Sequence, residues 1–151
     1  KEMPTVCIAG FPNVGKTTLL TKITGSSAEI NEYAFTTKSL NLGYAQLQGT
    51  RVQFVDTPGT LNRKEMNAIE RQAHLALKYV ADVIVYVFDL TLSYPLDEQL
   101  ALRKQVDGYK KPVIEYLSKT DLLTPEQITA FAHADANVSI QALLETLEGH
   151  L

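Results

Sequence analysis

A pattern of glycines, one lysine and one threonine near the N-terminus predicts a phosphate-binding loop. Residues 10–17 read Gly-Phe-Pro-Asn-Val-Gly-Lys-Thr and satisfy G-x-x-x-x-G-K-[ST]. Glycines let the backbone turn so that consecutive N–H groups point at phosphate oxygens, and the helix that follows adds the positive end of its dipole. Lys16 supplies an ammonium for the outer phosphates, and the Thr17 hydroxyl can bind Mg²⁺. The predicted phosphate cradle consists of Asn13, Val14, Gly15, Lys16, Thr17 and Thr18, with Lys16 also a candidate catalytic group.

Two further segments carry polar groups at the ends of predicted strands. The first is Asp56-Thr57-Pro58-Gly59, in which Asp56 can hold a magnesium-bound water and the Gly59 N–H can reach a γ-phosphate, a catalytic role. The second is Ser118-Lys119-Thr120-Asp121. Parallel sheets bind ligands beyond the carboxyl ends of their strands, so we expect all three segments to meet at one edge.

Asp121 is the residue that distinguishes between nucleotides. Its carboxylate can accept hydrogen bonds from two donors on the Watson–Crick edge of guanine, whereas adenine presents an acceptor at one of those positions. At about 1.5–3 kcal/mol for each charge-assisted bond, the loss of two would favour guanine by ~10² to 10⁴. An ATP-using phosphotransferase remains a weaker alternative, because Asp121 would have no purpose in it.

Strand and helix patterns alternate along the chain, which predicts a mainly parallel sheet between helix layers. The predicted strands are Thr5–Ala9, Ser39–Gln48, Arg51–Asp56, Val83–Phe88 and Pro112–Leu117, with Gly49-Thr50 as a hairpin link. The predicted helices are Lys16–Thr24, Met66–Val80, one beginning at Pro95, one beginning with a capping box at Thr124–Gln127, and one around Ala142–Leu147, preceded by Asn137–Ile140. Residues 26–37 read as a polar stretch, and Glu115 is an unexplained acid inside an apolar strand.

Length and composition limit the class of protein. The 151 residues fit one domain, and the 45% hydrophobic and 21% charged fractions are those of a soluble globular protein. A net charge of −3 argues against a dedicated nucleic-acid surface. Cys7 is the only cysteine and lies in an apolar run, which favours a buried thiol. No apolar stretch approaches a membrane span, and we expect a cytoplasmic location.

The strings GFPNVGKT, YAFTTKS, DTPG and SKTD, in this order, resemble the translation-factor class of P-loop GTPases. They are most similar to the Obg-like superfamily and, within it, to the nucleolar GTP-binding protein (Nog) family and its archaeal relatives. The resemblance covers nearly the whole chain. It implies a three-layer α/β/α P-loop NTPase fold (Ras-like), with a mainly parallel six-stranded sheet and one antiparallel strand.

The resemblance also implies functional segments and partners. Residues Ile30–Ser39 and Asp56–Asn67 would be switch segments; Thr37, with Thr36 as second choice, would complete the Mg²⁺ shell and assist catalysis. Guanine would stack on the Lys119 stem and meet the backbone around Ser139-Ile140. The implied pathway is assembly of the large ribosomal subunit, with ribosomal particles or assembly factors as partners and a nucleolar location in a eukaryote. The N-terminal helical region of that family is absent here, so we expect residues 1–151 to be a single GTPase domain excised from a longer chain.

Two departures from the family pattern bear on nucleotide affinity, and a further position bears on the rate of hydrolysis. Ser118 stands where the family has asparagine, and Ile140 stands where alanine is common, so both could weaken nucleotide binding. Thr60 occupies the place of the water-orienting glutamine of many switch GTPases, and no obvious arginine finger is present, Arg63 being a weak candidate. We therefore expect slow GTP hydrolysis, and a GTP/GDP-dependent binding module with negligible turnover is the alternative. Asn13 either holds a K⁺ ion that assists hydrolysis or only shapes the loop.

Overall fold

The computed structural model describes residues 3–25, 29–31, 40–58, 68–91, 94–131 and 136–151. Six strands form one sheet in the order β2-β3-β4-β1-β5-β6. They are β1 Thr5–Ala9, β2 Glu29–Asn31, β3 Leu40–Leu47, β4 Thr50–Asp56, β5 Val83–Phe88 and β6 Val113–Leu117. Strand β3 runs antiparallel to both β2 and β4, and the other pairings are parallel. The predicted six-stranded sheet with one antiparallel strand is confirmed.

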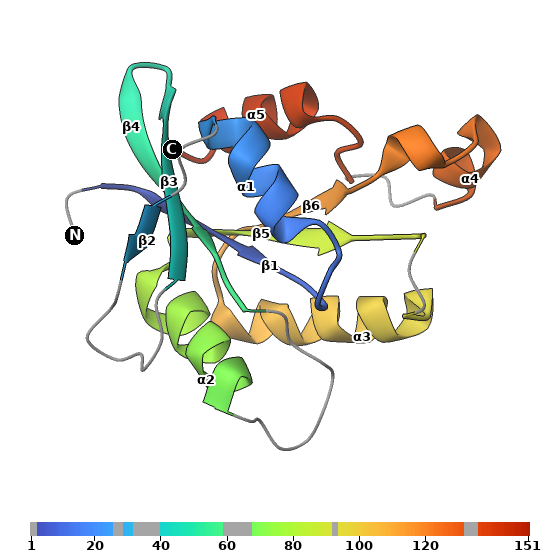
Figure 1. Cartoon of the computed structure of the whole chain (residues 1–151), viewed down its shortest axis with the longest axis horizontal. Helices are drawn as coiled ribbons and strands as arrows, with labels where there is room; N and C mark the ends of the chain where they lie inside the picture. The colour runs from blue at the N-terminus through green and yellow to red at the C-terminus, as the bar shows by residue number, and fades with distance from the viewer. Residues whose placement is uncertain (1–2, 26–28, 32–39, 59–67, 92–93, 132–135) are drawn as a thin grey trace.

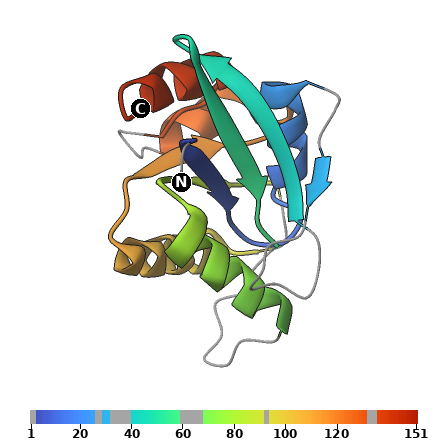
Figure 2. The same ribbon diagram turned by 90° about the vertical axis from the view of Figure 1, so that its left-hand side faces the viewer.

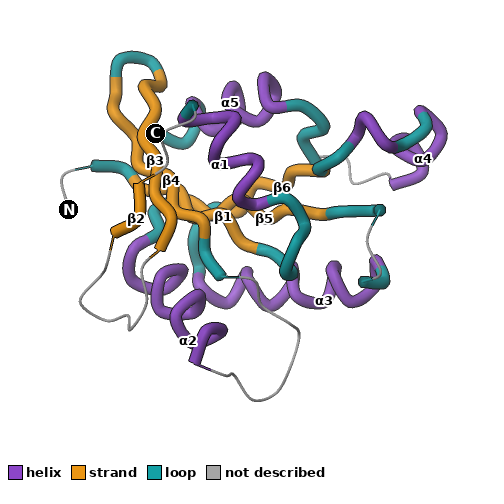
Figure 3. Tube along the Cα trace, viewed as in Figure 1, coloured by secondary structure: helices purple, strands orange, loops and turns teal. Residues whose placement is uncertain are grey.

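Helices cover both faces of this sheet and give the predicted three layers (Figure 1). Helices α1 (Lys16–Thr24) and α5 (Ile140–Glu148) lie on one face, and α2 (Ala68–Leu75) and α3 (Leu96–Val106) lie on the other. The perpendicular view in Figure 2 shows the same separation, and Figure 3 follows the alternation of strand and helix along the chain. The remaining elements are α4 (Pro125–Phe131), a π-helical turn η1 (Ala76–Val80), and the 3₁₀ turns η2 (Asp107–Tyr109) and η3 (Thr120–Leu122).

The centre of the sheet is the centre of the core. Every residue of β1 and β5 is buried, as expected for parallel strands covered on both faces. The Phe88 ring packs edge-on against Tyr86 and Phe131, with centroid distances of 4.9 and 5.1 Å. Cys7 is fully buried, as its apolar run predicted. This rigid centre fixes the ends of β1, β5 and β6, from which the loops of the candidate site start.

The acid inside β6 has a structural partner on helix α3. The Arg103 Nε lies 2.8 Å from the Glu115 carboxylate, and Arg103 Nη1 lies 2.7 Å from Asp107. The arginine therefore compensates the buried charge of Glu115. The sequence left two explanations open, an edge position and a cation partner, and both hold: β6 is the last strand in the sheet order, and Arg103 supplies the cation.

Several element boundaries differ from the sequence-based expectations. Strand β2 lies inside the stretch that was read as polar loop, because its three residues pair with β3 rather than follow an apolar pattern of their own. The β3–β4 hairpin turns at Gln48-Gly49, both with positive φ, so Thr50 belongs to the strand. Asn137 forms a single parallel bridge to Tyr116, and α5 begins three residues later at Ile140.

Candidate functional site

The loop between β1 and α1 adopts a backbone that its sequence makes possible. Gly10, Asn13 and Gly15 all have positive φ (151°, 64° and 105°). A Cβ atom on Gly10 would lie 2.9 Å from the Val87 carbonyl oxygen, so only glycine fits this close approach to β5. The chain then enters α1 with Gly15 as the residue before the first helical turn. The first N–H groups of an α-helix have no partner within the helix, so the start of α1 is a place where an anion can be bound.

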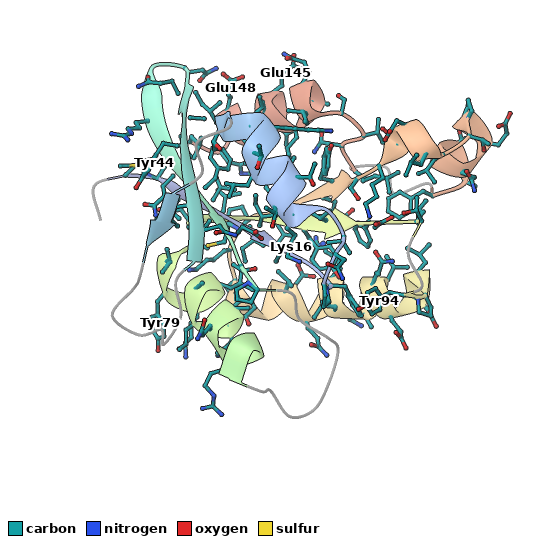
Figure 4. The ribbon with its side chains drawn as sticks, in the orientation of Figure 1. Lys16, Tyr44, Tyr79, Tyr94, Glu145 and Glu148 are labelled. Atoms are coloured by element: carbon teal, nitrogen blue, oxygen red, sulfur yellow. The ribbon has the colours of Figure 1, made fainter. Side chains whose placement is uncertain are left out.

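Lys16 lies within this loop as a buried cation. Its Nζ donates to the carbonyl oxygens of Phe11 (2.7 Å) and Gly10 (3.3 Å). Burial lowers the pKa of Lys16 to about 8, although the nearby Asp56 acts in the opposite direction. An ammonium with so little water around it gains strongly from an incoming phosphate group. Figure 4 shows Lys16 at the start of α1, beside the ends of the central strands.

Thr17 and Asp56 form a contact that suits a divalent cation. The Thr17 hydroxyl donates to Asp56 Oδ2 at 2.5 Å. Burial raises the pKa of Asp56, and hydrogen bonds from Thr17 and Asn41 and the charge of Lys16 only partly oppose it. A hydroxyl and a desolvated carboxylate are hard oxygen ligands, which fit Mg²⁺. Thr57 steadies the same strand end, because its hydroxyl donates to the Ile8 carbonyl at 2.7 Å.

These groups surround a cleft of about 460 Å³. The lining residues are Pro12, Asn13, Gly15, Lys16, Thr17, Thr18, Asp56, Thr57, Pro58 and Lys119. The structure therefore brings together the phosphate loop, the first segment after β4 and the lysine after β6. The spacing of strand ends in the sheet, with β4 and β5 flanking β1, makes this convergence possible.

The segment after β6 reaches the phosphate loop through two side chains. The buried Ser118 hydroxyl lies 2.7 Å from the Val14 carbonyl oxygen and 3.0 Å from that of Phe88. Lys119 has a left-handed backbone (φ 57°) and its Nζ donates to the Asn13 carbonyl oxygen at 3.2 Å. Both residues therefore join β6 to the loop that begins after β1.

Asp121 and Ser139-Ile140 belong to two neighbouring segments, the turn η3 and the start of α5. Asp121 is exposed in the turn η3, and its charge, after burial, is the second cause of the raised pKa of Tyr116. The Ser139 side chain caps α5 by accepting from the Ala142 N–H at 3.1 Å, so Ile140 begins the helix. The Thr120 hydroxyl approaches the Val138 carbonyl oxygen at 3.5 Å, which places the two segments side by side.

One buried acid at this site was missed by sequence inspection. Asp89 follows β5 directly, is fully buried, and has Oδ2 2.6 Å from the Lys119 Nζ. The available signal was similar to that for Asp56, an acid at the end of an apolar strand. It was passed over because Asp89 belongs to none of the motifs.

Some of the expected site residues lie outside the described residues. They are Thr36, Thr37, Gly59, Thr60 and Arg63. The same applies to most of both expected switch segments, of which the structure describes 30–31, 56–58 and no more.

Comparison with known proteins gives relatives that agree with this geometry. The family described as 50S ribosome-binding GTPase matches residues 5–119. An uncharacterized protein of Methanocaldococcus jannaschii is 47% identical over 133 residues, which cover 85% of this chain and 37% of that protein. Nucleolar GTP-binding protein 1 of Drosophila melanogaster is 40% identical over 130 residues, covering 82% of this chain and 20% of that protein.

A solved structure shares the fold over the full chain. It is a variant of Era from Aquifex aeolicus bound to GDP and AlF₄⁻, with 25% identity and a TM-score of 0.73, and the match covers 100% of this chain and 57% of that one. In the part of the chain that the structure describes, no helix is long and apolar enough to cross a membrane.

Proposed function

This chain belongs to the 50S ribosome-binding GTPase family, and from that premise we propose that it binds GTP with Mg²⁺ and hydrolyses it to GDP and phosphate. The observation that carries the proposal is the buried Lys16 ammonium, held by main-chain carbonyl oxygens of the phosphate loop beside the Thr17–Asp56 contact. A desolvated cation, the N-terminus of a helix and hard oxygen ligands together match a triphosphate and its metal. We regard residues 1–151 as one GTPase domain.

The metal would be held by the Thr17 hydroxyl, by Asp56 through a water, and by Thr37. Mg²⁺ in that place would neutralise the charge that develops on the β- and γ-phosphates. Lys16 would bind the same outer phosphates, and the Gly59 N–H would donate to the γ-phosphate. The raised pKa of Asp56 supports this assignment, since a neighbouring dication restores the charged form that burial disfavours.

Guanine would be selected by residues after β6. Asp121 would accept from the guanine edge, the Lys119 stem would lie against the ring, and the main chain at Ser139-Ile140 would contribute a further contact. Lys119 lines the cleft, which supports a position beside the nucleotide. Ser118 and Lys119 are hydrogen-bonded to the loop that would carry the phosphates. These bonds would hold the base site and the phosphate site in a fixed relative position.

Hydrolysis by this domain alone would be slow. Thr60 stands where a water-orienting glutamine is common, and a missing arginine finger can cost ~10³ to 10⁵ in rate. A K⁺ ion held partly by Asn13 would supply some of the missing positive charge. The left-handed backbone of Asn13 is compatible with this role and equally with a purely conformational one.

The partner would be a ribosomal particle of the large subunit or an assembly factor. A relative named nucleolar GTP-binding protein 1 and a family described as 50S ribosome-binding GTPase support this pathway. GTP would order the switch segments and hydrolysis would release them. The protein would act in the cytoplasm, or in the nucleolus if the source is a eukaryote. The chain spans 37% and 20% of the two relatives, so the activity and partners of a whole protein belong to this proposal.

A second candidate is a guanine-nucleotide-dependent binding module with negligible turnover. The observation that favours it is Thr60, which cannot orient water as glutamine does. Single-turnover assays, with and without 50S precursor particles, separate the two candidates. Phosphate release that particles accelerate supports the switch, and absence of release in both conditions supports the module.

The first test is a calorimetric titration of the chain with GTP, GDP and ATP in the presence of Mg²⁺. We expect both guanine nucleotides to bind and ATP to bind at least ~10²-fold more weakly. Lys16→Ala should weaken the binding of all three nucleotides, whereas Asp121→Ala should weaken GTP and GDP binding alone and so remove the preference for guanine. Lys22→Ala, on the exposed side of the same helix, is the matched control. Equal affinity for ATP and GTP would overturn the assignment of the base.

A further inference from the structure

Asp89 is a buried charge whose two carboxylate oxygens face different partners. Oδ1 accepts from the Thr91 N–H at 2.7 Å and from the Thr91 hydroxyl at 2.6 Å. Oδ2 lies 2.6 Å from the ammonium of Lys119. A carboxylate with no exposed surface is costly unless it is paired and hydrogen-bonded, so this arrangement defines one orientation of the side chain.

The main chain of Asp89 is itself held by one side chain of helix α3. The amide of Gln99, which is buried, accepts from the Asp89 N–H and donates to the Asp89 carbonyl oxygen, both at 2.9 Å. The same amide donates to the Tyr94 carbonyl oxygen at 3.0 Å. The main chain at Asp89 is therefore held in place, and this fixes the point from which the Asp89 side chain extends.

The segment that contains Asp89 also touches the phosphate loop. The Tyr94 ring lies 4.7 Å from the ring of the buried Phe11, centroid to centroid. Figure 4 shows Tyr94 near the start of α3. Gln99, Asp89 and Tyr94 thus connect α3 to the nucleotide cleft.

Lys119 is the partly exposed member of this arrangement. Its side chain is 32% exposed, and its ammonium is held on one side by the Asn13 carbonyl oxygen and on the other by Asp89. A lysine stem has several rotatable bonds, so it loses conformational entropy when it is fixed. If the ammonium is already held before a ligand arrives, part of this entropy loss no longer opposes binding.

We propose that Asp89 is a positioning residue of the guanine site, which holds the Lys119 stem in place as the surface on which the base stacks. This inference rests on the proposed function, because it assigns Asp89 a role in nucleotide binding. Asp89 acts through Lys119, and Gln99 fixes Asp89 in turn. A purely structural ion pair is the competing explanation.

A double-mutant cycle with GDP distinguishes the two explanations. Asp89→Asn keeps the size of the side chain and an oxygen for Thr91, and Lys119→Met keeps an apolar stem without the charge. We expect each single variant to weaken GDP binding roughly tenfold, and the double variant to be no weaker than Lys119→Met. Asp97→Asn, an exposed acid in the first turn of α3, should bind GDP as the wild type does.

Pyrophosphate provides the readout that a structural role would not produce. Because the proposal concerns the base, pyrophosphate affinity should stay within about twofold in Asp89→Asn. Equal losses for GDP and pyrophosphate, or effects of the two substitutions that simply add, would overturn the inference. If Asp89→Asn does not fold, normal GDP binding by Lys119→Met alone overturns it as well. Failure of the wild type to bind GDP would instead refute the proposed function.

Discussion

The Ser118 hydroxyl, at the end of β6, donates a hydrogen bond of 2.7 Å to the main-chain carbonyl oxygen of Val14 in the phosphate loop. The two residues are 104 positions apart in the chain, and both are buried. Serine is shorter than the asparagine usual at this position in the resembled family, yet it bridges the loop and the base-side segment. The bond makes the position of the phosphate cradle depend on the end of β6.

Removal of this bond should weaken nucleotide binding. In Ser118→Ala the Val14 carbonyl oxygen loses its donor, and a net loss of about 1 kcal/mol corresponds to a five- to tenfold higher Kd for GDP. Ser118→Asn retains a donor and should bind GDP at least as well as the wild type. Calorimetry on the three proteins decides the matter; an unchanged Kd in Ser118→Ala would mean that the bond does not position the loop.

Titration of Lys16 should make GDP affinity depend on pH. The pKa of about 8 belongs to the nucleotide-free site, and a bound polyphosphate raises it because the anion favours the ammonium. Below pH 8 the lysine is charged both before and after binding, so affinity is flat. Above pH 8 binding must take up a proton, and Kd should rise by up to about tenfold per pH unit.

The control for this pH profile is Lys16→Ala, measured between pH 7 and 9.5. Titration of the nucleotide itself affects both proteins equally, so the difference between the two curves isolates Lys16. Parallel curves for variant and wild type would contradict the assignment.

Asp56 should lower the stability of the nucleotide-free protein while it supports the metal. Its pKa in the folded protein is raised above the unfolded value of 3.8, so the unfolded state gives up the proton first. The free energy of unfolding should therefore fall as pH rises from about 3.8 through the folded pKa. Asp56→Asn removes this loss, and we expect a higher Tm at pH 7 without nucleotide.

The same substitution should reduce the effect of Mg²⁺ on GTP affinity by about 10- to 100-fold. Thermal unfolding and GTP titrations with Mg²⁺ or EDTA measure the two effects, with Asp97→Asn as an exposed-acid control. A lower Tm together with intact Mg²⁺ dependence would show that Asp56 is structural.

Substitution of Asn13 tests the role of potassium. We expect GTP hydrolysis to be faster in KCl than in NaCl, and the difference to vanish in Asn13→Ala. That variant also disturbs the loop, since alanine tolerates a φ of 64° poorly. Asn13→Gly adopts this φ freely and lacks the amide, so it should lose the potassium effect with the loop intact. Retention of the effect in Asn13→Gly would assign Asn13 to loop shape alone.

How much of the site could be predicted depended on how far apart in the sequence the contacting residues lie. The phosphate loop was predictable because its geometry is local: glycines and a lysine within eight consecutive residues create the cradle, and the following helix completes it. The polar segments after β4 and β6 were predictable for a related reason. The carboxyl ends of parallel strands share one edge of a sheet, whatever the details of register.

The contacts that complete the site required the tertiary structure. Asp89 and Lys119 follow different strands, and their 2.6 Å contact exists because β5 and β6 are neighbours in the sheet and end together. Strand β2 has no strong apolar pattern and is a strand only through its pairing with β3. The amino-acid sequence by itself determined the local cradle and the alternation of strand and helix. Packing decided which buried charges meet and how far the pKa of Lys16 moves, because both depend on which distant segments exclude water from the same place.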